Sequence, residues 1–147
     1  MTKMKNLFAE TYEKVMALRA RYESASTESE KDEIRTEYNA VIEAAESIGK
    51  LAPYILNAYF TSKDNGNVVL DINESFSEEN VKAIVDCIRE NGIEKFTFSS
   101  RWSSAVDVAW LFQKNGCTLC GLVEINGNND PFKGQHEKLH AYLFKVN

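Results

Sequence analysis

Hydrophobic residues recur every three or four positions through the first third of the chain, which is the spacing of amphipathic helices. One helix is predicted over residues 3–24 and a second over residues 27–48, where Thr27 and Glu30 form a capping box. Because the connection is very short, we expect an antiparallel helical hairpin. The apolar stripes are Met4, Phe8, Thr11, Val15, Leu18 and Tyr22, and then Ile34, Tyr38, Val41, Ala45 and Ile48.

Residues 51–60 are almost continuously apolar and allow two interpretations. Pro53 suits the first turn of a helix, so we expect a short third helix that ends near residues 64–66. The alternative is a strand, with Asn65 and Gly66 as a hairpin turn into the next strand.

After residue 67 the pattern predicts strands alternating with helices. A helix capped by Ser77 and a helix over residues 104–114 separate the first three strands, and the last two strands form an antiparallel hairpin. The strands are expected at residues 68–72, 96–98, 118–125 and 139–146. The apolar sets of the two helices are Val81, Ile84, Val85 and Ile88, and then Val106, Ala109, Trp110 and Leu111.

The predicted fold class is α+β, with a single domain over residues 1–147. The helical hairpin (1–49) and the short third helix are expected to pack on a β-α-β-α-β-β unit (50–147) with a mixed, mostly parallel sheet.

Composition narrows the function classes. The 147 residues are 44% hydrophobic and carry a net charge of −5, which fits a folded domain but not a surface that neutralises phosphate. We therefore expect no direct binding of nucleic acid or membranes. No apolar run approaches the roughly 18 residues of a membrane span, and no secretory signal is evident. Three cysteines are an odd number for disulfides, so we expect a cytoplasmic protein.

Two cysteines and two histidines have the spacing of a zinc finger: Cys117, Cys120, His136 and His140. In such a finger both histidines lie on a helix, whereas here they lead into a strand. The cysteines are also predicted on a strand, where residues three apart point to opposite faces. We therefore expect no metal at these residues.

No recognised catalytic pattern is present, and we expect neither enzymatic activity nor a cofactor. The chain has no glycine-rich phosphate loop and no nucleophile elbow. Carboxylates at the start of the second helix are typical of a solvated first turn, or alternatively form an acidic face for a partner. These residues are Glu28, Glu30, Asp32, Glu33 and Glu37.

The run FTFSSRWSS joins a predicted strand to a predicted helix and also allows two interpretations. In the first it is a capped turn, with Ser100 or Ser103 as the N-cap and Trp102 packed over the sheet edge. In the second it binds an anion or a protein partner, because ligands bind where parallel strands end and a helix begins. The candidate residues are Ser99, Ser100, Arg101, Trp102, Ser103 and Ser104.

Two resemblances bear on this half of the chain. The FTFSS-x-WSS turn and the GL-x-EIN strand at residues 121–126 resemble a family of short uncharacterised proteins carried by phages and mobile elements of Gram-positive bacteria. The last β-α-β-β order resembles the second half of the GCN5-related acetyltransferase fold, with residues 112–117 as its helix end. That family binds coenzyme A through a glycine-containing loop, whereas the matching residues 73–79 contain three carboxylates and no glycine.

These observations favour a non-enzymatic, acidic protein-binding module. The first resemblance implies a more specific hypothesis, an anti-CRISPR-like inhibitor that binds the basic channel of a host defence nuclease. The alternative is a degenerate acetyltransferase-like protein that binds a small ligand or an acyl-coenzyme A. The oligomeric state stays open.

Overall fold

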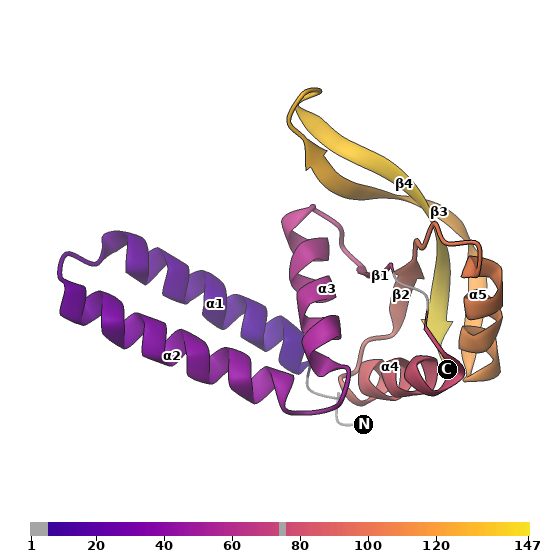
Figure 1. Cartoon of the computed structure of the whole chain (residues 1–147), viewed down its shortest axis with the longest axis horizontal. Helices are drawn as coiled ribbons and strands as arrows, with labels where there is room; N and C mark the ends of the chain where they lie inside the picture. Colours follow the sequence, from indigo (N-terminus) through magenta and orange to yellow (C-terminus); the bar gives the residue numbers. More distant parts are fainter. Residues whose placement is uncertain (1–5, 74–75) are drawn as a thin grey trace.

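The computed structural model describes residues 6–73 and 76–147, which form five helices and one four-stranded sheet (Figure 1). The predicted α+β class is therefore confirmed. In chain order the elements are α1 (Leu7–Ser24), α2 (Glu28–Glu46), α3 (Ala52–Asp64), β1 (Leu70–Ile72), α4 (Glu78–Glu90), β2 (Lys95–Phe98), α5 (Ala105–Lys114), β3 (Cys117–Asp130) and β4 (Gln135–Val146).

The sheet has the strand order β1-β2-β4-β3. β1 and β2 are parallel, with Leu70 opposite Phe96, whereas β4 is antiparallel to both of its neighbours. The sheet is mixed because the last two strands form a hairpin, and this hairpin inserts β4 beside β2. Only the β1–β2 pair is parallel, so the expectation of a mostly parallel sheet is wrong. The strands of the hairpin are longer than predicted and extend away from the other strands as an arm (Figure 1).

The core is built around an aromatic cluster on one face of the sheet. Phe96 of β2 and Phe144 of β4 contact Phe112 of α5, with ring centroids 5.0 and 5.4 Å apart. All three rings are fully buried, and so are the four predicted apolar residues of α4. Burying aromatic rings gives a large hydrophobic stabilisation, which fixes α4 and α5 on this face.

The N-terminal helices form the predicted hairpin, and its helices pack on α3 rather than directly over the strands (Figure 1). Thr27 is the N-cap of α2, and its side chain accepts a hydrogen bond from the Glu30 amide. Phe8 and Ala45 join the central core, while the turn between the helices lies far from the sheet. Met4 lies outside the described residues. Ile48 follows the end of α2 and is exposed, which corrects its predicted place in the apolar stripe.

The third segment is a helix, so the alternative strand is wrong. Pro53 lies in the first turn of α3, where its missing N–H leaves no helical hydrogen bond unmade. Asn65 ends the helix, and Gly66 follows with a φ of +78°, which few residues other than glycine adopt.

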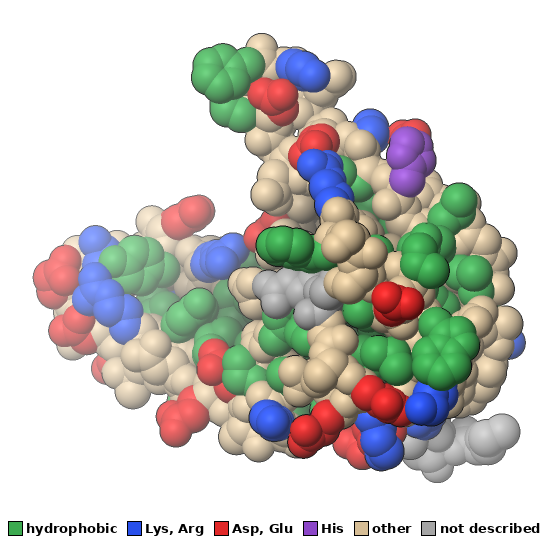
Figure 2. Space-filling view, turned by 45° about the vertical axis from the view of Figure 1, so that its right-hand side comes forward, with side chains coloured by type: hydrophobic (Ala, Val, Ile, Leu, Met, Phe, Trp, Pro, Cys, Tyr) green, Lys and Arg blue, Asp and Glu red, His purple; other side chains and the backbone are tan. Residues whose placement is uncertain are grey.

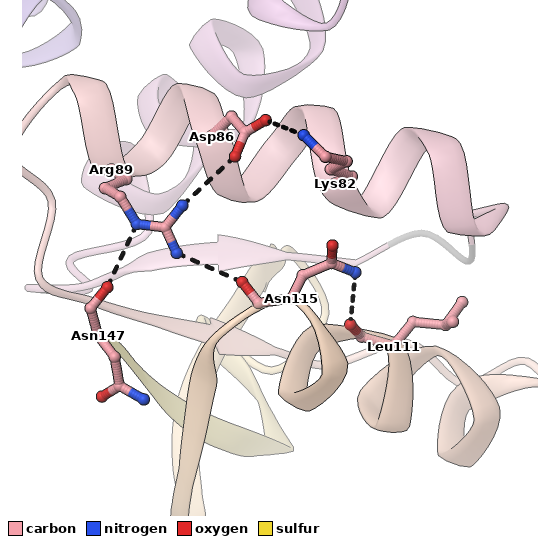
Figure 3. A network of polar contacts seen from close by, with 6 residues as sticks. All are labelled: Lys82, Asp86, Arg89, Leu111, Asn115 and Asn147. Atoms are coloured by element: carbon pink, nitrogen blue, oxygen red, sulfur yellow. Dashed lines mark hydrogen bonds and ion pairs between the residues drawn. The ribbon is translucent and has the colours of Figure 1, made fainter.

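Arg89 joins three segments, which are α4, the end of α5 and the residue after β4 (Figure 3). Its guanidinium group donates to the backbone carbonyls of Asn147 and Asn115, at 3.2 and 3.3 Å, and pairs with Asp86 of the same helix. α4 is thereby attached to the end of α5 and to the residue after β4. A planar guanidinium suits this role because it directs several donors at fixed angles.

We predict that Arg89→Ala lowers the free energy of unfolding by about 1–2 kcal/mol, because two carbonyls lose a charged donor. The conservative variant Arg89→Lys should recover only part of this loss, since an ammonium group lacks the fork geometry. Urea unfolding measures the effect. The control is Arg19→Ala, because Arg19 is exposed and has no hydrogen bond or ion pair with another described residue. Equal stability of the two alanine variants would contradict the role of the network.

Candidate functional site

In the turn after β2, some side chains point into the protein and others point to solvent. Ser99 is buried on the same side of the sheet as Thr97, as strand alternation requires, whereas Trp102 is 69% exposed. The N-cap of α5 is Ser104, and its side chain makes no capping hydrogen bond. The predicted cap at Ser100 or Ser103 is therefore wrong, and so is the packing of Trp102 over the sheet edge.

Asp71 is the partner of the buried Ser99. The parallel register places Asp71 opposite Thr97. The Thr97 hydroxyl donates to one carboxyl oxygen of Asp71 at 2.7 Å, and the Ser99 hydroxyl donates to the other at 2.6 Å. Burial raises the pKa of Asp71 to about 6, while the two hydrogen bonds act in the opposite direction. The sheet therefore holds a partly desolvated carboxyl group whose pKa is raised to about 6.

A cavity of about 350 Å³ adjoins this carboxyl group and lies between α3 and the β3–β4 hairpin. Most of its lining is polar, including several asparagines. Asn67 holds one wall together through its side chain: the side-chain amide donates to the Asn126 carbonyl, and the side-chain oxygen accepts from the Asn126 backbone N–H. Arg101 forms an ion pair with Glu137 across the cavity lining, so the turn after β2 is tied to β4.

The outer face of α5 is a second candidate surface. Val106 and Trp110 were predicted as core residues, but they are 68% and 58% exposed. The residues of α5 that enter the core are Val108 and Phe112. The helix is apolar on two sides, and the periodicity alone does not show which side faces the sheet. With Trp102, the exposed residues form a stripe on the outside of the molecule.

Three of the five predicted acidic residues of α2 form ion pairs with cations. Asp32 pairs with Arg35 at 2.7 Å, and Glu37 pairs with Arg21 of α1 at 3.0 Å. Glu28 lies 3.8 Å from Lys31, and the Glu30 carboxylate accepts a hydrogen bond from the Ser26 amide. Glu33 alone of the five has no such contact with another described residue. The predicted acidic face thus also contains the cations Lys31 and Arg35, and acidic residues remain in the majority there.

The four candidate zinc ligands lie on the β3–β4 hairpin, and the structure does not bring them together. Cys117 is buried at the base of the hairpin opposite Val146, and Cys120 is exposed. His136 lies near the tip, where its ring contacts the carbonyl of Gly127 at 2.9 Å. Within residues 6–73 and 76–147, no three histidine, cysteine or acidic side chains form a group that could hold a metal.

The segment that corresponds to the coenzyme A loop is only partly described. Glu74 and Ser75 lie outside the described residues, and Ser77 acts as the predicted N-cap of α4 by accepting a hydrogen bond from the Asn80 amide. In the part of the chain that the structure describes, no helix is both long and apolar enough to cross a membrane.

Fold and cavity together define an α+β protein with a small polar cavity at the carboxyl end of its parallel strands. The chain belongs to the family described as Domain of unknown function (DUF7698), whose model matches residues 54–146. The match contains the sheet, the Asp71 cavity and α5, whereas α1 and α2 lie outside it. Neither the curated proteins nor the solved structures gave a significant match.

Sequence reasoning missed Asp71, although one signal was present. An acidic residue in the middle of the apolar run VVLDI is rarely buried without a partner. Its partners, Thr97 in β2 and Ser99 in the turn after β2, lie 26 and 28 residues further along the chain. Only the pairing of β1 with β2 brings the three residues together.

We predict that Asp71→Asn stabilises the protein at pH 7 by about 1–3 kcal/mol. Because burial raises the pKa of Asp71 from 3.8 to about 6, the folded state binds the proton more tightly than the unfolded state. The shifted pKa therefore contributes fully to the free energy of unfolding below pH 4, where Asp71 is protonated in both states, and this contribution is lost as the pH rises through 6. Asparagine does not ionise, so the free energy of unfolding of the variant does not fall over this pH range for this reason.

The measurement is urea unfolding of both proteins at pH 4.5, 5.5 and 7.0. The stabilisation by asparagine should grow over this range, and the exposed Asp107→Asn control should change stability by less than about 0.5 kcal/mol throughout. A difference between wild type and Asp71→Asn that does not vary with pH would contradict the shifted pKa.

Proposed function

We propose that this protein is a non-catalytic binding module that docks on a partner protein through the outer face of α5. The observation that carries the proposal is the exposure of Trp102, Val106 and Trp110. Val106 and Trp110 are four residues apart and therefore lie on one side of α5, and Trp102 is exposed in the turn that precedes the helix. Figure 2 shows hydrophobic side chains gathered at the surface over this side of the molecule.

The stripe has the size of the apolar centre of an interface rather than of a whole interface. Covering the two indole rings and the valine would remove roughly 300 Å² of apolar surface from water, on the order of 7 kcal/mol before the costs of association. Tryptophan is also among the residues that most often dominate binding energy at protein interfaces.

The surroundings of the stripe indicate the chemistry of the partner. Asp107 is exposed beside Val106 and has no hydrogen bond or ion pair with another described residue. Lys114 lies over the Trp110 ring, but its charge is already paired with Glu78 of α4. The expected partner therefore has an apolar groove that accepts one side of a helix, with a basic residue at the rim opposite Asp107.

In a narrower form of the proposal, the partner is a host defence nuclease with a basic nucleic-acid channel. This protein would then be an inhibitor of phage or mobile-element origin that acts in the cytoplasm. The narrower form is supported by the net charge of −5 and by the FTFSS-x-WSS resemblance. The charges of α2 favour the α5 face as the contact surface, because four of the five α2 carboxylates are already engaged within the protein.

We predict that the double variant Trp102→Ala, Trp110→Ala weakens partner binding at least 100-fold, because truncation of one interface tryptophan costs about 2 kcal/mol or more. The partner is first isolated with the tagged protein from a Gram-positive bacterial lysate supplemented with purified Cas nucleases. Affinity is then measured by calorimetry with the purified partner. Phe132→Ala is the matched control, since Phe132 is exposed at the distant tip of the β3–β4 hairpin.

Two results would contradict the proposal. One is an unchanged affinity of the tryptophan variant together with loss of binding after charge reversal at Glu30, Glu33 and Glu37, which would place the contact on α2. The other is self-association of the wild-type chain, detected by sedimentation and abolished in the tryptophan variant. Salt separates the surfaces further, because an apolar contact persists at high ionic strength whereas a contact through α2 weakens.

A further inference from the structure

We propose that the cavity beside Asp71 binds a compact amino polyol, of which amino sugars are the simplest examples, by pairing its ammonium group with the Asp71 carboxylate. This site is distinct from the outer face of α5, so the proposal does not depend on the docking surface. It rests on the unused acceptor capacity of the carboxylate, the charge of the lining and the free polar groups of α3.

The Asp71 carboxylate has room for further donors. A carboxylate offers about four acceptor positions, and Thr97 and Ser99 each occupy one. These two hydroxyls also fix the orientation of the carboxyl group, so a ligand would find it already positioned. A partly buried carboxylate without a charged partner loses hydration free energy, and an ammonium group in the adjoining cavity would offset part of that loss.

The charge of the lining selects a cation. Four titratable side chains line the cavity within the described residues: Tyr54, Asp71, Arg101 and Glu137. The charges of Arg101 and Glu137 balance in their ion pair, which leaves Asp71 uncompensated. An anion such as a pyrophosphate would meet this carboxylate, whereas a molecule with one positive charge would neutralise it.

The opposite wall offers groups that recognise hydroxyls. Asn57 and Thr61 lie one helical turn apart on α3, face the cavity and are exposed. Neither side chain is hydrogen-bonded to another described residue, in contrast to Asn67 and Asn126, which hold the wall. An amide and a hydroxyl together can donate to and accept from a polyol. A volume of about 350 Å³ suits one small molecule of this class.

The test is titration of the full chain with glucosamine, galactosamine and mannosamine, followed by amide NMR and calorimetry. Glucose is the matched ligand control, because it has a hydroxyl in place of the amine of glucosamine. We expect shifts at Asp71, Ser99 and Thr61, and at least tenfold tighter binding of an amino sugar than of glucose. Shifts with none of the three amines, or equal binding of glucosamine and glucose, would overturn the proposal.

Variants separate this site from the docking surface. Asp71→Asn should weaken amine binding at least tenfold while the protein stays folded, and Asn57→Ala should weaken it by a smaller factor. Trp102→Ala, Trp110→Ala should leave amine binding unchanged, so a failure of either proposal can be distinguished from a failure of the other. Unchanged amine affinity in Asp71→Asn would place the ligand elsewhere and overturn the assignment.

The pH dependence gives a second readout. Burial raises the pKa of Asp71 to about 6, so amine binding should weaken as the pH falls from 7 to 5 and should release a proton near pH 6. The other titratable groups of the lining are Tyr54, Arg101 and Glu137. Repeating the pH series with Glu137→Gln shows whether the rim carboxylate contributes. An affinity that is independent of pH between 5 and 7 would contradict pairing with Asp71.

Discussion

The parallel pairing of β1 with β2 is the interaction on which both faces of the sheet depend. It places Leu70 beside Phe96 and Ile72 beside Phe98 on the side that forms the aromatic core. By the same register it places Asp71 opposite Thr97 on the other side. The apolar side is stabilised by the burial of its hydrophobic side chains. The polar side holds the Asp71 carboxyl group, whose pKa is raised by its own partial burial.

The turn after β2 contributes residues to two surfaces, the cavity beside Asp71 and the outer face of α5. Ser99 completes the hydrogen bonding of Asp71, and Arg101 joins the cavity lining to β4 through Glu137. One residue later, Trp102 turns outward and begins the stripe on α5. The turn is thus neither a simple cap nor a single binding site. A ligand in the cavity and a protein on α5 would lie on opposite sides of the same short segment.

Local chemistry explains which parts of the fold were predictable. Capping at Thr27 and Ser77, the proline in α3 and the apolar stripe of α4 all act within a few residues, and each predicted its element correctly. The faces of α5 were not predictable from spacing, because Val106 and Val108 are equally apolar and only the position of the sheet decides which is buried. The Asp71 cluster depended on strand pairing, which periodicity does not specify.

The Asp71 carboxyl group is partly buried and lines the cavity proposed to bind an amine. The most direct measurement is an NMR titration of the Asp71 side-chain carboxyl carbon, with and without saturating glucosamine. A midpoint near pH 6 that falls when the amine binds would agree with the structure. A midpoint near 4, unchanged by glucosamine, would show that the carboxyl group is well solvated and that the cavity does not recognise it.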